Sequence, residues 1–155
     1  MINDPIKASG VAWAAHQGQT YGDQSYYNGH LVPVARTARA LAEAWANSTL
    51  TDTTPLDPDE VETVAWLHDI IEDAGVIAQD LVEYGLDEHV VDAIMLLTRP
   101  LGKTYGAYIL RIAEGSSKAY RLAQIVKIAD LMVNITAPGK PELAKRYYHA
   151  LQVLA

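Results

Sequence analysis

Apolar residues recur at spacings of three and four along nearly the whole chain, and this period constrains the fold more than any other feature. One segment shows it with Val34, Ala38 and Leu41, which places apolar side chains on one face of a helix. No window shows alternating strand residues bounded by hairpin turns. The pattern predicts an all-α protein, a bundle of roughly six to eight helices.

Capping signals set the expected helix boundaries. Asp4 and Asp57 are each followed by a proline, which is typical of an N-cap before the first helical position. Glu60, three residues after Asp57, completes a capping-box pattern. We expect an ordered loop over 18–29, a mobile connector over 47–55, and a helix end at Pro138. We expect helices over residues 4–16, 31–45, 57–74, 77–84, 87–97, 104–114, 117–136 and from 141 onward, with Leu122, Ile125, Ala129, Met132 and Val133 on the buried side of the longest.

Length and composition limit the class of protein. The chain has 155 residues, half of them apolar, which is enough for a single domain spanning residues 1–155. Its net charge of −7 disfavours a nucleic-acid polymer as partner, and no apolar run is long enough to cross a membrane. It has no cysteine, and its N-terminus lacks the basic start of a secretory signal. We expect a cytoplasmic protein; no feature predicts an oligomeric state.

Residues 68–73 (HDIIED) carry the strongest chemical signal. In a continuous helix, His68 and Glu72 share a face, as do Asp69 and Asp73. Apolar neighbours should bury part of this turn, where carboxylates are costly unless they are paired or bind a metal. The C-terminal end of a helix also disfavours negative charge, and a bound cation would offset both penalties. The alternative is that the acids are solvated and His68 is a hydrogen-bonded core histidine.

Further ligands would come from elsewhere in the chain. His30 follows the glycine-rich loop, and Asp130 lies in an apolar helix with Asn134 one turn later. Two imidazoles and two carboxylates suit Mn²⁺, Fe²⁺ or Zn²⁺ and leave positions for water and a phosphate oxygen. The alternative for Asp130 is a buried salt bridge to Lys127, three residues before it.

The order of these motifs resembles the HD superfamily of metal-dependent phosphohydrolases. Five segments are similar to the RelA/SpoT-type alarmone hydrolases, and the similarity spans roughly residues 8–136. They are residues 15–19 (AHQGQ), 27–30 (YNGH), 34–35 (VA), 68–73 (HDIIED) and 126–134 (VKIADLMVN).

The resemblance implies a role for each residue of the site. A divalent metal, most commonly Mn²⁺ with Mg²⁺ also possible, would bind to His30, His68, Asp69 and Asp130. Glu72 and Asp73 would orient or deprotonate the attacking water, and Asn134 would contact the nucleotide. The favoured activity is hydrolysis of the small nucleotide (p)ppGpp at its 3′-diphosphate, which releases pyrophosphate.

Two departures from the alarmone hydrolases concern the substrate. Residues 20–22 (TYG) stand where those enzymes usually carry basic side chains, and residues 97–105 (LTRPLGKTY) replace their later substrate loop and look more like a group of small stand-alone HD proteins. The alternative activities are those of a 5′-nucleotidase or a dNTP phosphohydrolase, and after them a non-catalytic nucleotide sensor. The remaining candidates for substrate binding are Arg99, Lys103, Arg111, Lys127, Tyr105 and Tyr108, although the basic residues could be solvated loop charges and the tyrosines core residues.

Overall fold

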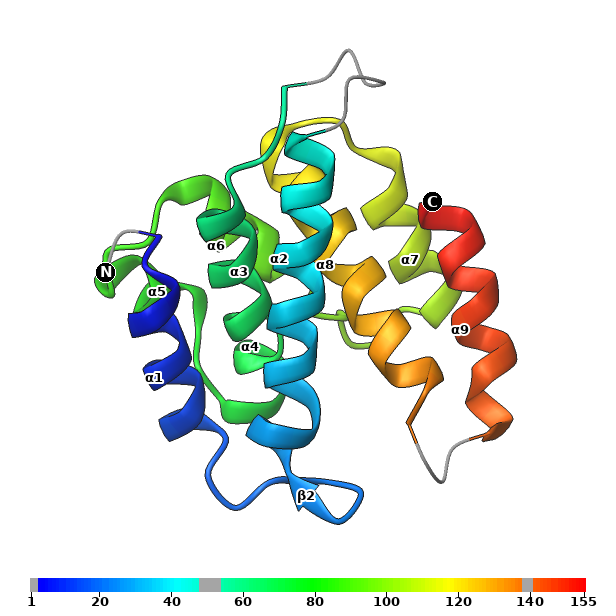
Figure 1. Ribbon diagram of the computed structural model, residues 1–155, viewed down its shortest axis with the longest axis horizontal. Coiled ribbons are helices and arrows are strands. Elements are labelled where there is room, and N and C mark those ends of the chain that lie inside the picture. The colour runs from blue at the N-terminus through cyan, green and yellow to red at the C-terminus, as the bar shows by residue number, and fades with distance from the viewer. Residues whose placement is uncertain (1–2, 48–53, 138–140) are drawn as a thin grey trace.

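Helices account for most of the computed structural model, which describes residues 3–47, 54–137 and 141–155 (Figure 1). The predicted all-α class is confirmed. Most of the predicted connector over 47–55, and the predicted stop at Pro138, lie outside the described residues. The helices are α1 (Pro5–Ala15), η1 (Tyr27–Leu31), α2 (Val32–Ala46), α3 (Pro58–Leu67), α4 (Ile70–Ala74), α5 (Ala78–Glu83), α6 (Glu88–Leu96), α7 (Tyr105–Glu114), α8 (Lys118–Ile135) and α9 (Pro141–Leu154).

Side-chain caps begin several helices where the sequence predicted. The Asp4 carboxylate accepts hydrogen bonds from the backbone of Ile6 and Lys7 at the start of α1. Asp57 caps α3, and the Thr104 hydroxyl accepts from the backbone of α7. These bonds satisfy amide groups that have no partner inside the helix. Helix boundaries outside residues 18–31 and 57–74 therefore lie within about two residues of the prediction.

Several local predictions are wrong, including the three that follow. The loop expected over 18–29 contains a two-stranded antiparallel hairpin, β1 (Thr20–Tyr21) with β2 (Gln24–Ser25), and the start of the π-helix η1. Glu60 does not complete a capping box, because its carboxylate binds His89 and Lys118 instead. Met132 is 43% exposed and lines a surface pocket with Pro33 and Thr37 of α2, so it is not on the buried side of α8.

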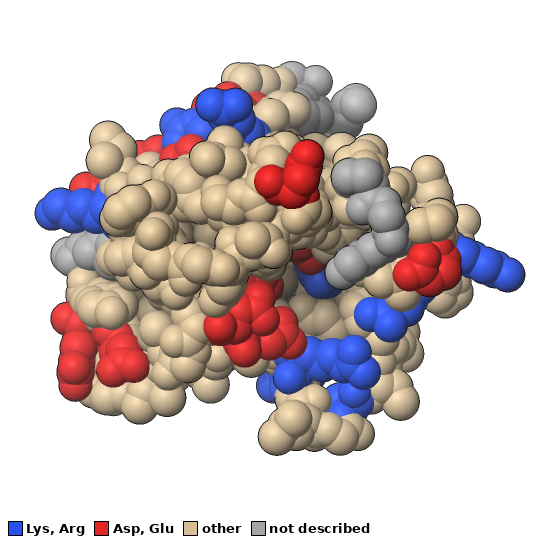
Figure 2. All heavy atoms as spheres, turned by 90° about the horizontal axis from the view of Figure 1, so that it is seen from below, with Lys and Arg blue, Asp and Glu red and all other residues tan. Residues whose placement is uncertain are grey.

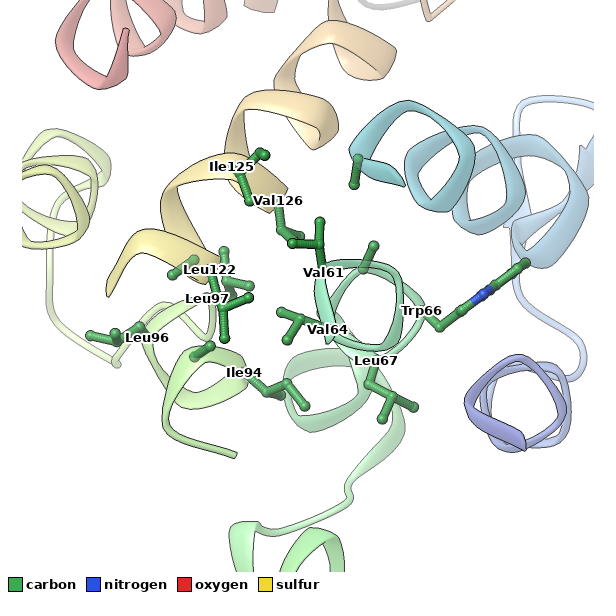
Figure 3. Packing of buried hydrophobic residues seen from close by; sticks show 14 of the residues in the cluster. Val61, Val64, Trp66, Leu67, Ile94, Leu96, Leu97, Leu122, Ile125 and Val126 are labelled. Atoms are coloured by element: carbon green, nitrogen blue, oxygen red, sulfur yellow. The ribbon is translucent and has the colours of Figure 1, made fainter. Parts of the chain in front are cut away.

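The core brings the end of α3 beside the middle of α8. Helix α2 contacts both α3 and α8, α1 packs on α3, and α9 packs on α7 and α8 (Figure 1). Val61 and Val64 of α3 face Leu122 and Val126 of α8, whereas Trp66 points away from them (Figure 3). Among the described residues, no helix is long and apolar enough to cross a membrane.

Candidate metal centre

The hairpin and the π-helix together position His30. A π-helix is rare and often marks a functional site, and here η1 continues directly into α2. Gly29 of η1 packs against the hairpin, since a Cβ atom at this position would lie 3.2 Å from the backbone oxygen of Tyr21. His30 is therefore held in a π-helical turn that is braced by the hairpin, where the sequence predicted only the end of a loop before a helix over 31–45.

His68 and Asp69 stand at a break between two helices, which corrects the prediction of one helix over 57–74. Helix α3 ends at Leu67, and Asp69 leaves the helical region with φ −103° and ψ 3° before α4 begins at Ile70. The break therefore separates His68 from Glu72, whereas the Asp73 amide still donates to the Asp69 backbone oxygen at 2.9 Å, one helical turn away. The unfavourable helix dipole expected at Asp69 does not apply, because Asp69 precedes a helix of five residues and does not end one.

The structure brings together the four residues proposed as ligands. The imidazole Nε2 atoms of His30 and His68 face one carboxylate oxygen from Asp69 and one from Asp130. The ligand atoms of His30, His68 and Asp69 all lie within 4.8 Å of one another. The four distances are His30 Nε2 to Asp69 Oδ2 3.5 Å, His30 Nε2 to Asp130 Oδ1 3.0 Å, His68 Nε2 to Asp69 Oδ2 3.0 Å and His68 Nε2 to Asp130 Oδ1 3.4 Å.

The tautomer of His68 suits metal binding. Its Nδ1 atom lies 2.7 Å from the backbone oxygen of Ala65, and because a carbonyl only accepts, Nδ1 carries the hydrogen. In the neutral imidazole the lone pair is then on Nε2, which faces the carboxylates. A hydrogen bond of this kind from the outer nitrogen is typical of histidines that bind metals, so the donor set fits a divalent ion.

Burial makes the electrostatics of this cluster strong. His30 and His68 are each 2% exposed and Asp130 is 4% exposed. Burial alone would lower the pKa of His68, but the charge of Asp69 and the hydrogen bonds of both carboxylates raise it well above its ordinary value of 6.5. Burial would likewise raise the pKa of Asp69, but His68 and His30 hold it below its usual range. The cluster therefore stabilises cationic charge between its carboxylates.

Asp130 also forms the predicted ion pair with Lys127. Lys127 Nζ lies 2.6 Å from Asp130 Oδ2, and both side chains are buried. The other oxygen, Oδ1, faces the two imidazoles and accepts a hydrogen bond from Asn134 Nδ2 at 3.2 Å. The two interpretations of Asp130 are therefore compatible, because each uses a different oxygen.

Glu72 and Asp73 lie on α4 beside this cluster, each partly at the surface and partly covered by neighbouring residues. Glu72 Oε1 accepts a hydrogen bond from the backbone amide of Arg99 at 3.3 Å. Partial burial, and then the charge of Asp69, raise the pKa of both carboxyl groups. Each has therefore become a stronger proton acceptor than an ordinary carboxylate.

The residues predicted to bind substrate lie in different parts of the structure. Tyr105 and Lys127 lie together, with Lys127 Nζ 5.8 Å from the centre of the Tyr105 ring. Tyr108 is a core residue whose hydroxyl donates to the backbone oxygen of Leu97 at 2.7 Å. The side chain of Lys103 is exposed. Arg111 lines a separate cavity of about 610 Å³, whose lining includes none of the four proposed ligands.

Sequence reasoning missed three side chains of the site. The Tyr26 hydroxyl donates to Asp69 Oδ2, and the Tyr21 hydroxyl donates to Asn134 Oδ1 at 2.8 Å. The guanidinium carbon of Arg146 lies 3.8 Å from the centre of the Tyr105 ring. The available signal was the group of three tyrosines, Tyr21, Tyr26 and Tyr27, in the polar loop just before His30, but no spacing rule links a loop to a distant carboxylate.

The comparisons with known proteins agree with this geometry. The HD domain family matches residues 27–135, a range that includes all four proposed ligands and both carboxylates of α4. No curated protein matches the chain significantly. Because the match covers more than half of the sequence, the chain belongs to the HD domain family, whose members are metal-dependent phosphohydrolases.

Proposed function

We propose that this protein hydrolyses a phosphate or pyrophosphate ester of a nucleotide, with (p)ppGpp as the favoured substrate. The observation that carries the proposal is the meeting of two imidazole nitrogens and two carboxylate oxygens within hydrogen-bonding range of one another. Burying two carboxylates is costly without a cation, and Lys127, the buried lysine beside them, binds the outer oxygen of Asp130.

His30, His68, Asp69 and Asp130 would hold the divalent metal, for which Mn²⁺ is our first choice. Mixed nitrogen and oxygen donors suit Mn²⁺, Fe²⁺ or Zn²⁺. When bound, such an ion supplies Lewis acidity and lowers the pKa of water toward neutrality. The chain's own contribution is to fix the ligands, through the His68 bond to Ala65 and the Asp130 bonds to Lys127 and Asn134.

Glu72 and Asp73 would handle the proton of the attacking water. Their pKa values are raised by partial burial and by Asp69, so each takes up a proton more readily than a free carboxylate. The backbone amide of Arg99 holds one oxygen of Glu72, and among the described residues no hydrogen bond is made by the other. An efficient general base combines such a position with a pKa nearer neutrality.

A basic wall adjoins the cluster and would receive the phosphate groups. We define it as Arg99, Lys103, Lys127 and Arg146. Three of its cations lie near Tyr105: the Arg99 guanidinium carbon, Lys127 Nζ and the Arg146 guanidinium carbon are 5.9, 5.8 and 3.8 Å from the ring centre. Arg99 Nε donates to the backbone oxygen of Lys103. One face of the molecule shows basic side chains gathered beside acidic ones at the edge of a hollow (Figure 2).

Two links join the basic wall to the proposed reaction site. Lys127 binds Asp130 directly, and the backbone of Arg99 binds Glu72. An anionic substrate would therefore meet cations on the side of the metal that α7, α8 and α9 form. Guanidinium and ammonium groups beside the metal centre suit a substrate with more than one phosphate.

The hairpin supports the second candidate, a 5′-nucleotidase or dNTP phosphohydrolase. Tyr21, which stands where alarmone hydrolases usually carry positive charge, turns toward Asn134. This side of the cluster therefore offers no cation from the hairpin for a second diphosphate.

A product assay separates the candidates. Mn²⁺-loaded protein would be incubated with (p)ppGpp, deoxynucleoside triphosphates and nucleoside 5′-monophosphates, and the released anion identified. We expect pyrophosphate from (p)ppGpp; triphosphate or phosphate from the other substrates, with (p)ppGpp left intact, favours the second candidate.

Two variants complete this assay. Asp69→Ala should abolish turnover, whereas Asp92→Ala, an exposed aspartate of α6, should not. Full activity in Asp69→Ala would overturn the site. Nucleotide binding without any turnover by the loaded protein would instead indicate a sensor.

A further inference from the structure

Two tyrosines from one short segment reach both carboxylates of the proposed metal centre. Tyr26, directly after the hairpin, donates its hydroxyl hydrogen to Asp69 Oδ2. This is the same oxygen that lies 3.0 Å from His68 Nε2. A carboxylate oxygen has two lone pairs, so the phenol can occupy one while the other faces the imidazoles.

Tyr21, on the first strand of the hairpin, acts on the other carboxylate through one intermediary. Its hydroxyl lies 2.8 Å from Asn134 Oδ1, and Asn134 Nδ2 lies 3.2 Å from Asp130 Oδ1. A carboxylate only accepts hydrogen bonds, so the amide must present its NH₂ group to Asp130 and its oxygen to Tyr21. Asn134 therefore has partners inside the site, in addition to the nucleotide contact implied by the family resemblance.

Both phenol rings also pack on His30. Their centres lie 4.8 Å and 5.0 Å from the centre of the imidazole, for Tyr21 and Tyr26 respectively. The backbone fixes this arrangement, because the Tyr26 amide donates to the Gln19 oxygen at 2.8 Å and closes the base of the hairpin. The segment thus touches three of the four proposed ligands, either directly or through Asn134.

We infer that Tyr21 and Tyr26 are positioning residues that orient Asp130 and Asp69 toward the metal. The inference rests on the proposed function only in requiring that these aspartates bind a metal. It gives the hairpin a role in building the metal centre, at the place where alarmone hydrolases usually carry basic residues. Hydrogen-bond partners of metal ligands set ligand orientation, and their loss typically lowers metal affinity about 10- to 100-fold.

The test is calorimetric titration of the metal-free full chain with Mn²⁺, at a temperature where each variant is folded. Tyr26→Phe keeps the ring and removes only the hydroxyl group. Tyr27→Phe is the matched control, because Tyr27 stacks on Trp66 at 5.2 Å and its hydroxyl has no hydrogen bond among the described residues. Asp69→Ala tests the metal site itself.

We expect Tyr26→Phe to weaken Mn²⁺ binding about 10- to 100-fold. Tyr21→Phe should weaken it less, since it acts through Asn134, and Tyr27→Phe should leave it unchanged. A merely structural role would lower the melting temperature of the metal-free protein while the dissociation constant stayed the same.

The outcomes separate this inference from the proposed function. If Asp69→Ala abolishes binding while both Tyr26→Phe and Tyr21→Phe bind Mn²⁺ as tightly as the wild type, the positioning role is wrong and the metal site stands. If Asp69→Ala binds Mn²⁺ normally, the site and this inference both fail. Should Tyr26→Phe not fold, Tyr21→Phe alone decides, with unchanged affinity as the contradicting result.

Discussion

At the scale of single residues, Asp130 links the metal centre to the basic wall. One of its oxygens faces His30 and His68, and the other binds Lys127. Burial alone would lower the pKa of Lys127, but the charge of Asp130 raises it above the usual range. Lys127 therefore remains charged beside the site and serves first as the partner of Asp130.

Lys127→Ala should destabilise the metal-free protein by about 3–5 kcal/mol, because it leaves the buried Oδ2 atom of Asp130 without its ionic partner. Chemical denaturation of chelated protein would measure the loss. Lys7→Ala, at an exposed position of α1, is the control and should change stability by less than about 0.5 kcal/mol. Equal stability of the two variants would contradict the role given to the pair.

The two histidines should make the stability of the metal-free protein and the stabilisation by Mn²⁺ change in opposite directions with pH. The pKa values of His30 and His68 are raised by the carboxylates, against the effect of burial. Protonated imidazoles therefore stabilise the metal-free fold fully below about pH 6.5, and this contribution is lost as the pH rises through the raised values. Metal binding needs neutral imidazoles, so Mn²⁺ should stabilise the protein more as the pH rises.

Melting temperatures with Mn²⁺ and with a chelator, from about pH 6 to about pH 9, test this trend. The difference between the two curves isolates the metal centre, because every other titrating group contributes to both. We expect the difference to widen with pH. Curves that stay parallel would show that the imidazoles do not exchange protons for the metal.

At the scale of elements, the sequence predicted most helices but not the two irregular segments that form the site. Caps such as Asp4 and Thr104 act through bonds to adjacent residues, so local sequence reveals them. The break at Asp69 has no such signal, because residues 61–74 keep the apolar period of a helix. At this break the Asp69 side chain contacts Tyr26 and His30, which lie about forty residues away in the chain.

Gly29→Ala tests whether the hairpin braces η1. The new methyl group would lie 3.2 Å from the backbone oxygen of Tyr21 and from Gln24 Cβ, so the hairpin must shift. We expect a loss of about 1–3 kcal/mol in the free energy of unfolding.

Gly10→Ala, in α1, is the matched control for Gly29→Ala. A Cβ atom there meets nothing within 4 Å, so this variant should be more stable than the wild type by about 0.5–1 kcal/mol. If Gly29→Ala is equally tolerated, the close packing of η1 on the hairpin is not important.

At the scale of the whole molecule, α9 adds to the site a residue from outside the HD family match. The match ends at residue 135, and α9 packs on both α7 and α8. Its Arg146 covers the Tyr105 ring and completes the basic wall. A helix starting near residue 141 was predictable from Pro141, but the face that it turns toward Tyr105 depends on tertiary packing.

Arg146→Ala should raise the KM for the substrate about tenfold while Mn²⁺ affinity stays unchanged, since a charge-assisted bond to phosphate contributes about 1.5 kcal/mol or more. Steady-state kinetics and Mn²⁺ titration would measure the two effects. Lys145→Ala, the neighbouring exposed lysine, is the control. An unchanged KM in Arg146→Ala would remove α9 from the substrate side of the site.

The central claim is that four side chains from η1, the α3–α4 junction and α8 form a metal centre. Metal content after equilibrium dialysis against Mn²⁺ tests it most directly, with the folded wild type and His30→Ala measured in parallel. The structure predicts stoichiometric Mn²⁺ in the wild type and loss of most of it in His30→Ala, because one of the two imidazoles is removed. Equal metal content in the two proteins, or none in the wild type, would contradict the claim.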